Sequence, residues 1–250
     1  MPFLTKIFKA FIGGILFLTR RRTMDLRELF KGKRIAVIGA ASSLFDHENG
    51  SYIDGFDYVI RINKAVYNLN EDNDKHLGKK TDILFHCFFE NDISGGGKLD
   101  FEHYDKLRIE YVFNPRNTPD GWRTVFNFYK KYLSRRHIYT LPRSFYAGLQ
   151  ADFGTVRPTT GYAALYTALS SDYNKCFITG FTFFRTAYAD GYRDKLKEVS
   201  INKKFIADQG IHDPDMEFAH FQKMIAEFPN ENLEIDTALS KILQSEKETV

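Results

Sequence analysis

The chain has 250 residues, of which 43% are hydrophobic and 27% charged, and its formal net charge at pH 7 is +3. This is the composition of a globular protein, and the near balance of 35 basic and 32 acidic side chains argues against a nucleic-acid partner. Two cysteines, Cys87 and Cys176, are too few for a disulfide scaffold or a four-cysteine zinc site.

The first part of the chain is apolar and basic. Residues 3–19 are apolar except for two lysines, and three arginines follow at 20–22. The uninterrupted apolar run, 10–18, is far shorter than the roughly 20 residues that cross a bilayer, whereas an apolar segment with cations suits an anionic membrane surface. We predict a membrane-associating segment at 1–23, contacting the membrane surface through 3–22, with the body of the protein at the cytoplasmic face. The alternative is a helix packed on the protein's own core or on a partner.

From residue 33 onwards, short apolar runs alternate with segments of helical periodicity. Such alternation is typical of an α/β fold in which helices flank a mostly parallel sheet. Residues 182–211 are polar, contain tyrosines and show weak periodicity, so we expect a mobile lid there. The predicted strands are 34–43, 56–65, 81–89, 109–116, 137–142, 175–181 and 233–236, and the predicted helices are 118–136, 157–171 and 214–228.

Two of the predicted strands end in residues that suit a ligand. In the loop GAASS, 39–43, the small size of Gly39 allows backbone N–H groups to approach a phosphate or ribose. The hydroxyl group of Ser42 adds a hydrogen-bond donor. The loop is neither the dinucleotide motif G-x-G-x-x-G nor a P-loop. RINKA, 61–65, ends the second strand with Asn63, which either binds a hydroxyl or phosphate or holds a turn.

A predicted helix start, RPTTG at 157–161, offers a second set of polar groups. Thr159 or Thr160 can cap the helix, and Gly161 permits a close approach by another group. A helix N-terminus with free N–H groups attracts carboxylates and phosphates, and Arg157 adds a fixed positive charge. The alternative is an ordinary capped helix.

The stretch GIHDPDMEF, 210–218, contains a single histidine at another predicted helix start. Asp213 can cap the first turn and Pro214 suits its first position. His212 is therefore a base, a metal ligand or merely a polar residue before a helix. Glu217, five residues later, either orients a partner or lies on the helix surface.

Together these motifs resemble those of sialyltransferases. IAVIGAASSL with FDYVIRINKA, then RPTTGYAALYTAL with CFITGF, and the late H-x4-E are similar to the large, small and very small motifs of glycosyltransferase family 29. HLGKKTDILFH and the tyrosines of FFRTAYADGYRD look equally like the bacterial family 42. The resemblance covers about residues 33–225. It implies a modified GT-A, Rossmann-like single domain at 24–250, a CMP-sugar donor, inversion at the anomeric carbon, and no metal or other cofactor.

The resemblance also implies roles for particular residues. Gly39, Ser42 and Asn63 would bind the donor nucleotide, and Thr160 and Gly161 would bind either the nucleotide or the donor carboxylate. Arg157, from its charge, is a further candidate for binding the donor nucleotide. Tyr188 and Tyr192 would stabilise the departing phosphate, and His212 would act as general base on the acceptor hydroxyl. The acceptor would be a glycan or lipid-linked glycan.

The sequence departs from family 29 at two places. Ala40 stands where that family has an asparagine, and the cysteines that link the main motifs in animal enzymes are missing. The second departure implies a bacterial-like cytoplasmic protein, and neither sialic acid nor Kdo is favoured as the donor sugar. Two alternatives stay open: a non-catalytic CMP-binding protein, and a metal-dependent transferase that uses a UDP- or GDP-sugar through DND (72–74) or DPD (213–215).

Overall fold

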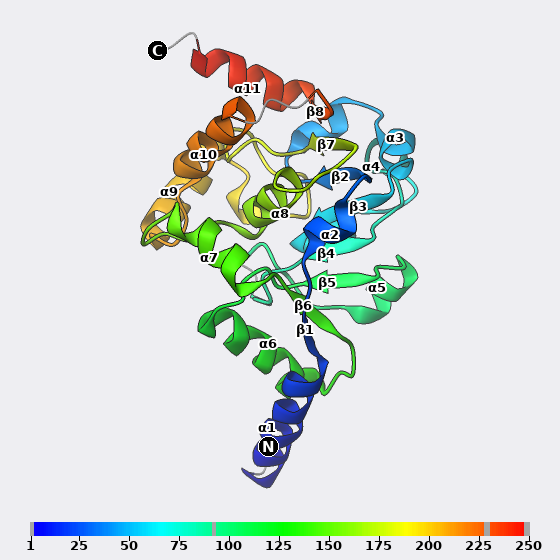
Figure 1. The fold of residues 1–250 in the computed structure, drawn as a ribbon, viewed down its shortest axis with the longest axis vertical. Helices are drawn as coiled ribbons and strands as arrows, with labels where there is room; N and C mark the ends of the chain where they lie inside the picture. Colours follow the sequence, from blue (N-terminus) through cyan, green and yellow to red (C-terminus); the bar gives the residue numbers. More distant parts are fainter. Residues whose placement is uncertain (1–2, 92–93, 228–230, 248–250) are drawn as a thin grey trace.

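A single sheet forms the centre of the fold (Figure 1). Across residues 3–91, 94–227 and 231–247, which the computed structural model describes, the sheet has eight strands and every paired neighbour is parallel. The parallel α/β fold that the sequence predicts is therefore confirmed. In spatial order the strands are β1 (Arg21–Thr23), β6 (Ile138–Thr140), β5 (Tyr111–Phe113), β4 (Ile83–Phe85), β3 (Tyr58–Ile62), β2 (Arg34–Ile38), β7 (Lys175–Thr179) and β8 (Leu233–Ile235).

The central strands are apolar on both sides because helices cover both faces of the sheet. Val37 of β2 lies opposite Ile60 of β3 and Ile178 of β7, and all three are fully buried. On their face pack α2 (Leu26–Phe30), α7 (Arg143–Ala151), α8 (Thr160–Leu169), α10 (Pro214–Glu227) and α11 (Thr237–Lys247). On the other face pack α3 (Gly50–Asp54), α4 (Asp74–Leu77), α5 (Phe101–Lys106) and α6 (Pro119–Tyr132), with the 3-10 turn η1 (Ser42–Asp46).

The helix starts at the predicted site have the expected caps. The Thr159 side chain accepts a hydrogen bond from the Tyr162 N–H at the start of α8, and the Asp213 carboxylate accepts one from Met216 at the start of α10. Pro214 is the first residue of α10. These capping predictions are confirmed.

The region 182–211, where the sequence predicts a mobile lid, contains regular structure. It holds the 3-10 turn η3 (Asp194–Leu196) and an eleven-residue helix, α9 (Val199–Gln209). Helical periodicity is weak because only Asn202 and Ile206 of α9 are buried. We call residues 182–211 the lid segment.

The N-terminal segment forms a long helix that ends in an edge strand. Helix α1 (Phe3–Arg20) lies against α6 at one end of the molecule, and residues 21–23 continue into β1, which pairs with β6 (Figure 1). The contact with α6 is close, because a Cβ at Gly13 would lie 2.7 Å from the Cα of Lys130. No helix in the described ranges is long and apolar enough to cross a membrane.

Candidate active site

The site lies where the direction of the chain through the sheet reverses. From β2 the chain runs outward through β3, β4, β5 and β6, and β7 then adds on the other side of β2. Ligands of open α/β sheets bind at the carboxyl ends of the strands beside such a reversal. A cavity of about 400 Å³ lies there, between the strand ends, the start of α8 and the lid segment. We call it the main cavity.

Most of the predicted site residues line the main cavity. The exception is Ser42, which begins η1, and whose backbone N–H donates to the Ala187 carbonyl (2.9 Å). The residues that do line it come from five separate stretches of sequence: Gly39, Asn63, Arg157, Thr160, Gly161, Tyr188, Tyr192, His212 and Glu217.

The GAASS loop is held by the protein itself. The Gly39 N–H donates to the Thr179 carbonyl (2.8 Å) and the Ala41 N–H to the Gly180 carbonyl (3.0 Å). A Cβ at Gly39 would lie 2.1 Å from the Gly180 oxygen, so glycine is required by the approach of two strand ends. The small residues Gly39 and Ala41 line the cavity and also allow the loop to pack closely against Gly180.

Asn63 connects three parts of the site. Its backbone is in the left-handed region (φ 52°), which asparagine tolerates better than most residues. The side-chain Oδ1 accepts from the Cys87 N–H after β4 (2.9 Å), and Nδ2 donates to the Tyr192 hydroxyl of the lid segment (3.4 Å). Asn63 thus holds a turn and also faces the main cavity.

The start of α8 lines the cavity. Thr160 and Gly161 are its first two residues, and N–H groups in the first turn of a helix have no partner within the helix. The Gly161 position is crowded, since a Cβ there would lie 3.2 Å from the Phe181 ring. Two N–H groups at the positive end of the helix dipole suit a carboxylate or phosphate.

Glu217 is buried rather than on the helix surface, with an exposed fraction of 2%. Its carboxyl group accepts from the Thr159 N–H (2.5 Å) and the Thr159 hydroxyl (3.0 Å). It therefore holds the start of α8 against α10. Burial raises the pKa of Glu217 to about 8, although the hydrogen bonds from Thr159 act in the opposite direction.

This raised pKa predicts a pH-dependent stability. The folded state keeps the Glu217 proton up to about pH 8, whereas the unfolded chain loses it near pH 4.5, so stability falls as the pH rises through this window. The slope is about 1.4 kcal/mol per pH unit. Glu217→Gln keeps the shape and cannot ionise, so its free energy of unfolding should fall less between pH 6 and pH 8 than that of the wild type. The free energies of unfolding are measured by urea titration at each pH. An equal fall between pH 6 and pH 8 in the wild type and the variant would contradict this prediction.

His212 is fixed through one nitrogen of its ring. Nδ1 lies 2.7 Å from the Arg157 carbonyl oxygen, and the Arg157 N–H donates to the Ile211 carbonyl (2.8 Å). Because a carbonyl only accepts, Nδ1 carries the proton and the lone pair is on Nε2. Burial lowers the pKa of His212, and the charges of Arg116, Arg193 and Arg157 lower it further, so the imidazole is neutral at neutral pH.

The two lid tyrosines lie side by side over the cavity. The ring centroids of Tyr188 and Tyr192 are 4.9 Å apart, and the backbone around Tyr188 pairs with Ala41 of the GAASS loop. Burial raises the pKa of both phenols, so both remain protonated and can donate hydrogen bonds. This pairing brings Ala41 and Tyr188, which are 147 positions apart in the sequence, to one wall of the cavity.

Two arginines to which the sequence assigned no role also line the cavity. Arg116 follows β5, where the loops after strands meet, and its guanidinium donates to the Cys87 carbonyl (3.3 Å). Arg193 belongs to the lid segment, and its buried Nε has no hydrogen-bond partner among the described residues. With Arg157 they give the cavity three cations, a charge suited to an anionic ligand.

The two D-x-D stretches make structural contacts. Asp74 pairs with Lys79 (2.9 Å), and Asp215 pairs with Arg185 (3.2 Å). Asp213 caps α10, as described above. In the part of the chain that the structure describes, no three His, Cys, Asp or Glu side chains converge as a metal site would require.

Comparison with known proteins identifies a family. The model of glycosyltransferase family 29 (sialyltransferase) matches residues 18–228. The chain is similar in structure to the monofunctional α-2,3-sialyltransferase Cst-I from Campylobacter jejuni, with a TM-score of 0.51 and 16% sequence identity over 82% of this chain and 75% of that chain. At this identity the likeness shows a shared fold. No curated protein sequence matches.

Two other solved structures are similar at a lower TM-score. One is sialyltransferase CstII from Campylobacter jejuni in complex with cytidine-5'-monophosphate, with 16% identity, 82% and 80% of the two chains covered, and a TM-score of 0.49. The other is a mammalian sialyltransferase in complex with Gal-beta-1-3GalNAc-ortho-nitrophenol, with 16% identity, 84% and 71% covered, and a TM-score of 0.49.

Proposed function

The chain belongs to glycosyltransferase family 29, the sialyltransferases, and we propose that it transfers sialic acid or Kdo from a CMP-sugar to a hydroxyl group of a glycan or lipid-linked glycan. The observation that carries this proposal is His212. Its Nδ1 is held by a backbone carbonyl, and its ring faces the same cavity as the start of α8 and the two lid tyrosines.

The charges of the cavity support an anionic donor. A CMP-linked keto-acid sugar carries one phosphate and one carboxylate. The N–H groups of Thr160 and Gly161 suit the carboxylate, while Arg116, Arg157 and Arg193 supply positive charge around the donor. Arg157 pairs with Asp120 at 3.1 Å, but Arg116 and Arg193 still provide two positive charges, enough to balance a single phosphate without a divalent cation. We therefore propose a metal-independent reaction.

The proposed reaction is a direct displacement. Nε2 of His212 accepts the proton of the acceptor hydroxyl as its oxygen attacks the anomeric carbon. The bond to the phosphate breaks as the new bond forms on the opposite face, so the configuration inverts. Tyr188 and Tyr192 donate hydrogen bonds to the phosphate oxygen on which negative charge develops. Glu217 acts through Thr159 by holding the start of α8 in position.

A donor screen tests the proposed activity. CMP-Neu5Ac, CMP-Kdo, a UDP-sugar and a GDP-sugar are incubated with the protein, and nucleotide release is measured with and without EDTA. We expect release of CMP only, at an unchanged rate in EDTA, and CMP should raise the melting temperature without added metal. Release of UDP or GDP that EDTA abolishes would favour the metal-dependent alternative. CMP binding without turnover of either CMP-sugar would identify a non-catalytic protein.

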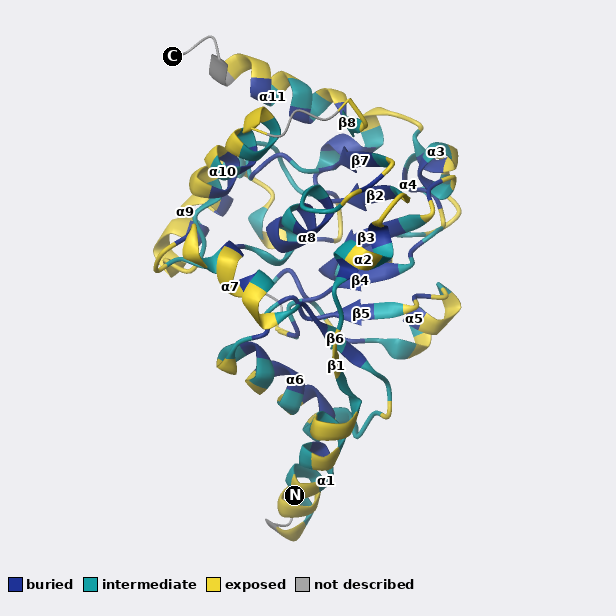
Figure 2. Ribbon diagram, viewed as in Figure 1, coloured by how far each residue is buried: buried dark blue, intermediate teal, exposed yellow. Residues whose placement is uncertain are grey.

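We further propose that α1 lies on the cytoplasmic surface of a membrane. Its outward face is an apolar stripe with helical spacing, opposite the face that packs on α6, and Figure 2 shows it as exposed. The segment 3–23 contains five cations and no acidic residue, which complements anionic lipids. An 18-residue helix on this edge suits the membrane interface. The stripe comprises Leu4, Ile7, Phe8, Phe11, Ile15 and Leu18.

Vesicle flotation tests this membrane contact. The full chain should float with vesicles of phosphatidylcholine and phosphatidylglycerol, and less well in high salt, which screens the basic residues. The variant Phe8→Ser, Phe11→Ser should bind at least about tenfold more weakly, because two large apolar side chains no longer enter the interface. The control Thr5→Ser changes a residue outside the stripe. Equal flotation of all three proteins would exclude a role for the stripe.

A further inference from the structure

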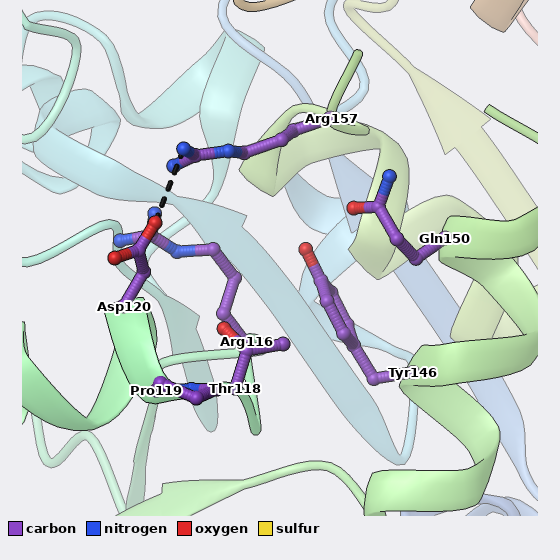
Figure 3. A pocket seen from close by; sticks show the side chains of 7 residues that line it. All are labelled: Arg116, Thr118, Pro119, Asp120, Tyr146, Gln150 and Arg157. Atoms are coloured by element: carbon purple, nitrogen blue, oxygen red, sulfur yellow. Dashed lines mark ion pairs between the residues drawn. The ribbon is translucent and has the colours of Figure 1, made fainter. Parts of the chain in front are cut away.

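A second cavity of about 330 Å³ lies beside the main cavity. We call it the side pocket, and Figure 3 shows its lining side chains. The two cavities share Arg116 and Arg157. The remaining walls are the first turn of α6 and one face of α7, elements that contribute no residue to the donor side of the site as described above. The volume is at the lower end of small-molecule pockets.

The polar groups of α7 face the side pocket from neighbouring turns. Tyr146 and Gln150 are four residues apart, so their side chains lie on the same helix face. The Gln150 Nε2 donates to the Val156 carbonyl (2.7 Å), which fixes the amide, and Figure 3 shows its oxygen on the side of Tyr146 and Arg157. Burial raises the pKa of Tyr146 to about 12, so its hydroxyl stays protonated.

The opposite wall carries charge. The Asp120 carboxylate, in the first turn of α6, pairs with Arg157 at 3.1 Å and lies near Arg116 in Figure 3. The pocket therefore combines a carboxylate and an amide oxygen, which accept hydrogen bonds, with two guanidinium groups and a phenol, which donate them. Hydroxyl groups both donate and accept, so a polyhydroxylated ligand can satisfy this set.

Arg157 connects the side pocket to the proposed base. Its backbone carbonyl holds His212, while its side chain extends to Asp120 in the side pocket. A general base must lie within hydrogen-bond reach of the hydroxyl that it deprotonates. A ligand bound in the side pocket would therefore lie next to Arg157, the residue that orients His212.

We infer that the side pocket binds the acceptor sugar, with Gln150, Tyr146 and Asp120 as its hydrogen-bonding partners. This inference rests on the proposed transferase function, because it assigns the second substrate of the same reaction. The ligand class is a glycan whose terminal sugar presents neighbouring hydroxyls to these groups. Gln150 and Tyr146 determine acceptor affinity, and the main cavity accommodates the donor.

The test separates the two substrates. Transfer from CMP-Neu5Ac and from CMP-Kdo is measured over a panel of soluble galactosides, N-acetylgalactosaminides and sialosides, with the best acceptor carried forward. In Tyr146→Phe and Gln150→Leu the KM for that acceptor should rise about three- to tenfold each, as expected for one lost hydrogen bond, and further in the double variant. The Kd for CMP and the KM for the donor should stay at wild-type values. Ser144→Ala, on the exposed side of α7, is the matched control.

The kinetic results can also contradict the inference. An unchanged acceptor KM in the double variant, or a rise in the donor KM to the same extent, would mean that the pocket does not bind the acceptor. If the wild type releases CMP into water but transfers to no glycoside, saturation-transfer NMR with CMP-loaded protein and the same panel decides. Binding of a glycoside that the double variant loses supports the inference, and no such binding overturns it.

Failure of the proposed function has a different signature. In that case the wild type releases CMP from neither donor, with or without acceptor. The same NMR experiment still reports on the side pocket, because it measures glycoside binding and not turnover. A loss of binding in the double variant would then support a sugar site in a protein without transferase activity.

Discussion

Replacing His212 by alanine is expected to lower the rate of sugar transfer by about 10²- to 10⁴-fold, the usual contribution of a general base. The loss is expected in kcat, because the proton leaves the acceptor only in the transition state. The Kd for CMP should stay close to that of the wild type, since His212 accepts a proton and does not neutralise the donor. Initial rates with CMP-Neu5Ac or CMP-Kdo, together with calorimetric titration of CMP, measure both quantities.

The pH profile of the wild type provides an independent check. The lowered pKa of His212 means that the imidazole is neutral, and therefore basic, down to a pH below its ordinary value of 6.5. The transfer rate should rise with pH and level off already below pH 6.5. The control variant His47→Ala, at an exposed position, should keep the wild-type rate and profile. Full activity of His212→Ala would exclude this residue as the base.

The second large effect is expected from the lid tyrosines. Tyr188→Phe and Tyr192→Phe each remove one hydroxyl and keep the ring that packs against its neighbour. The loss of one donor to a developing negative charge typically lowers kcat by about 10²- to 10³-fold. Since both hydroxyls would act on the same phosphate, the double variant should lose less than the product of the two single effects.

The measurement must separate catalysis from folding, because the Tyr192 hydroxyl also accepts a hydrogen bond from Asn63. Melting temperatures of the variants, with and without CMP, report on that contact. Tyr166→Phe is the matched control, since Tyr166 is half-buried on α8 and does not line the main cavity. If both single variants turn over CMP-sugar at the wild-type rate, the leaving phosphate is stabilised by other groups.

Much of the fold could be predicted because it depends on local patterns. The apolar runs at 34–43 and 175–181 contain β2 and β7, and the hydroxyl before an apolar helix at Thr159 is its cap. The same patterns mark the ends of strands, where site residues of parallel sheets gather. Gly39, Asn63 and Thr160 could therefore be predicted as site residues before any contact was known. Arg116 follows β5 and obeys the same rule, but its sequence context indicates no particular role.

The sequence by itself determined the order of seven strands, from β2 to β8, and of the helices α6, α8 and α10, together with the family motifs and nine residues that line the main cavity, because each depends on a short stretch of the chain. The tertiary structure alone decided which of those residues meet. Gly39 packs against Gly180, and Glu217 is hydrogen-bonded to Thr159. The apolar stripe of α1 is exposed, and α7 lies beside Arg157. These contacts join residues far apart in sequence, and burial and pKa depend on such neighbours rather than on the local pattern.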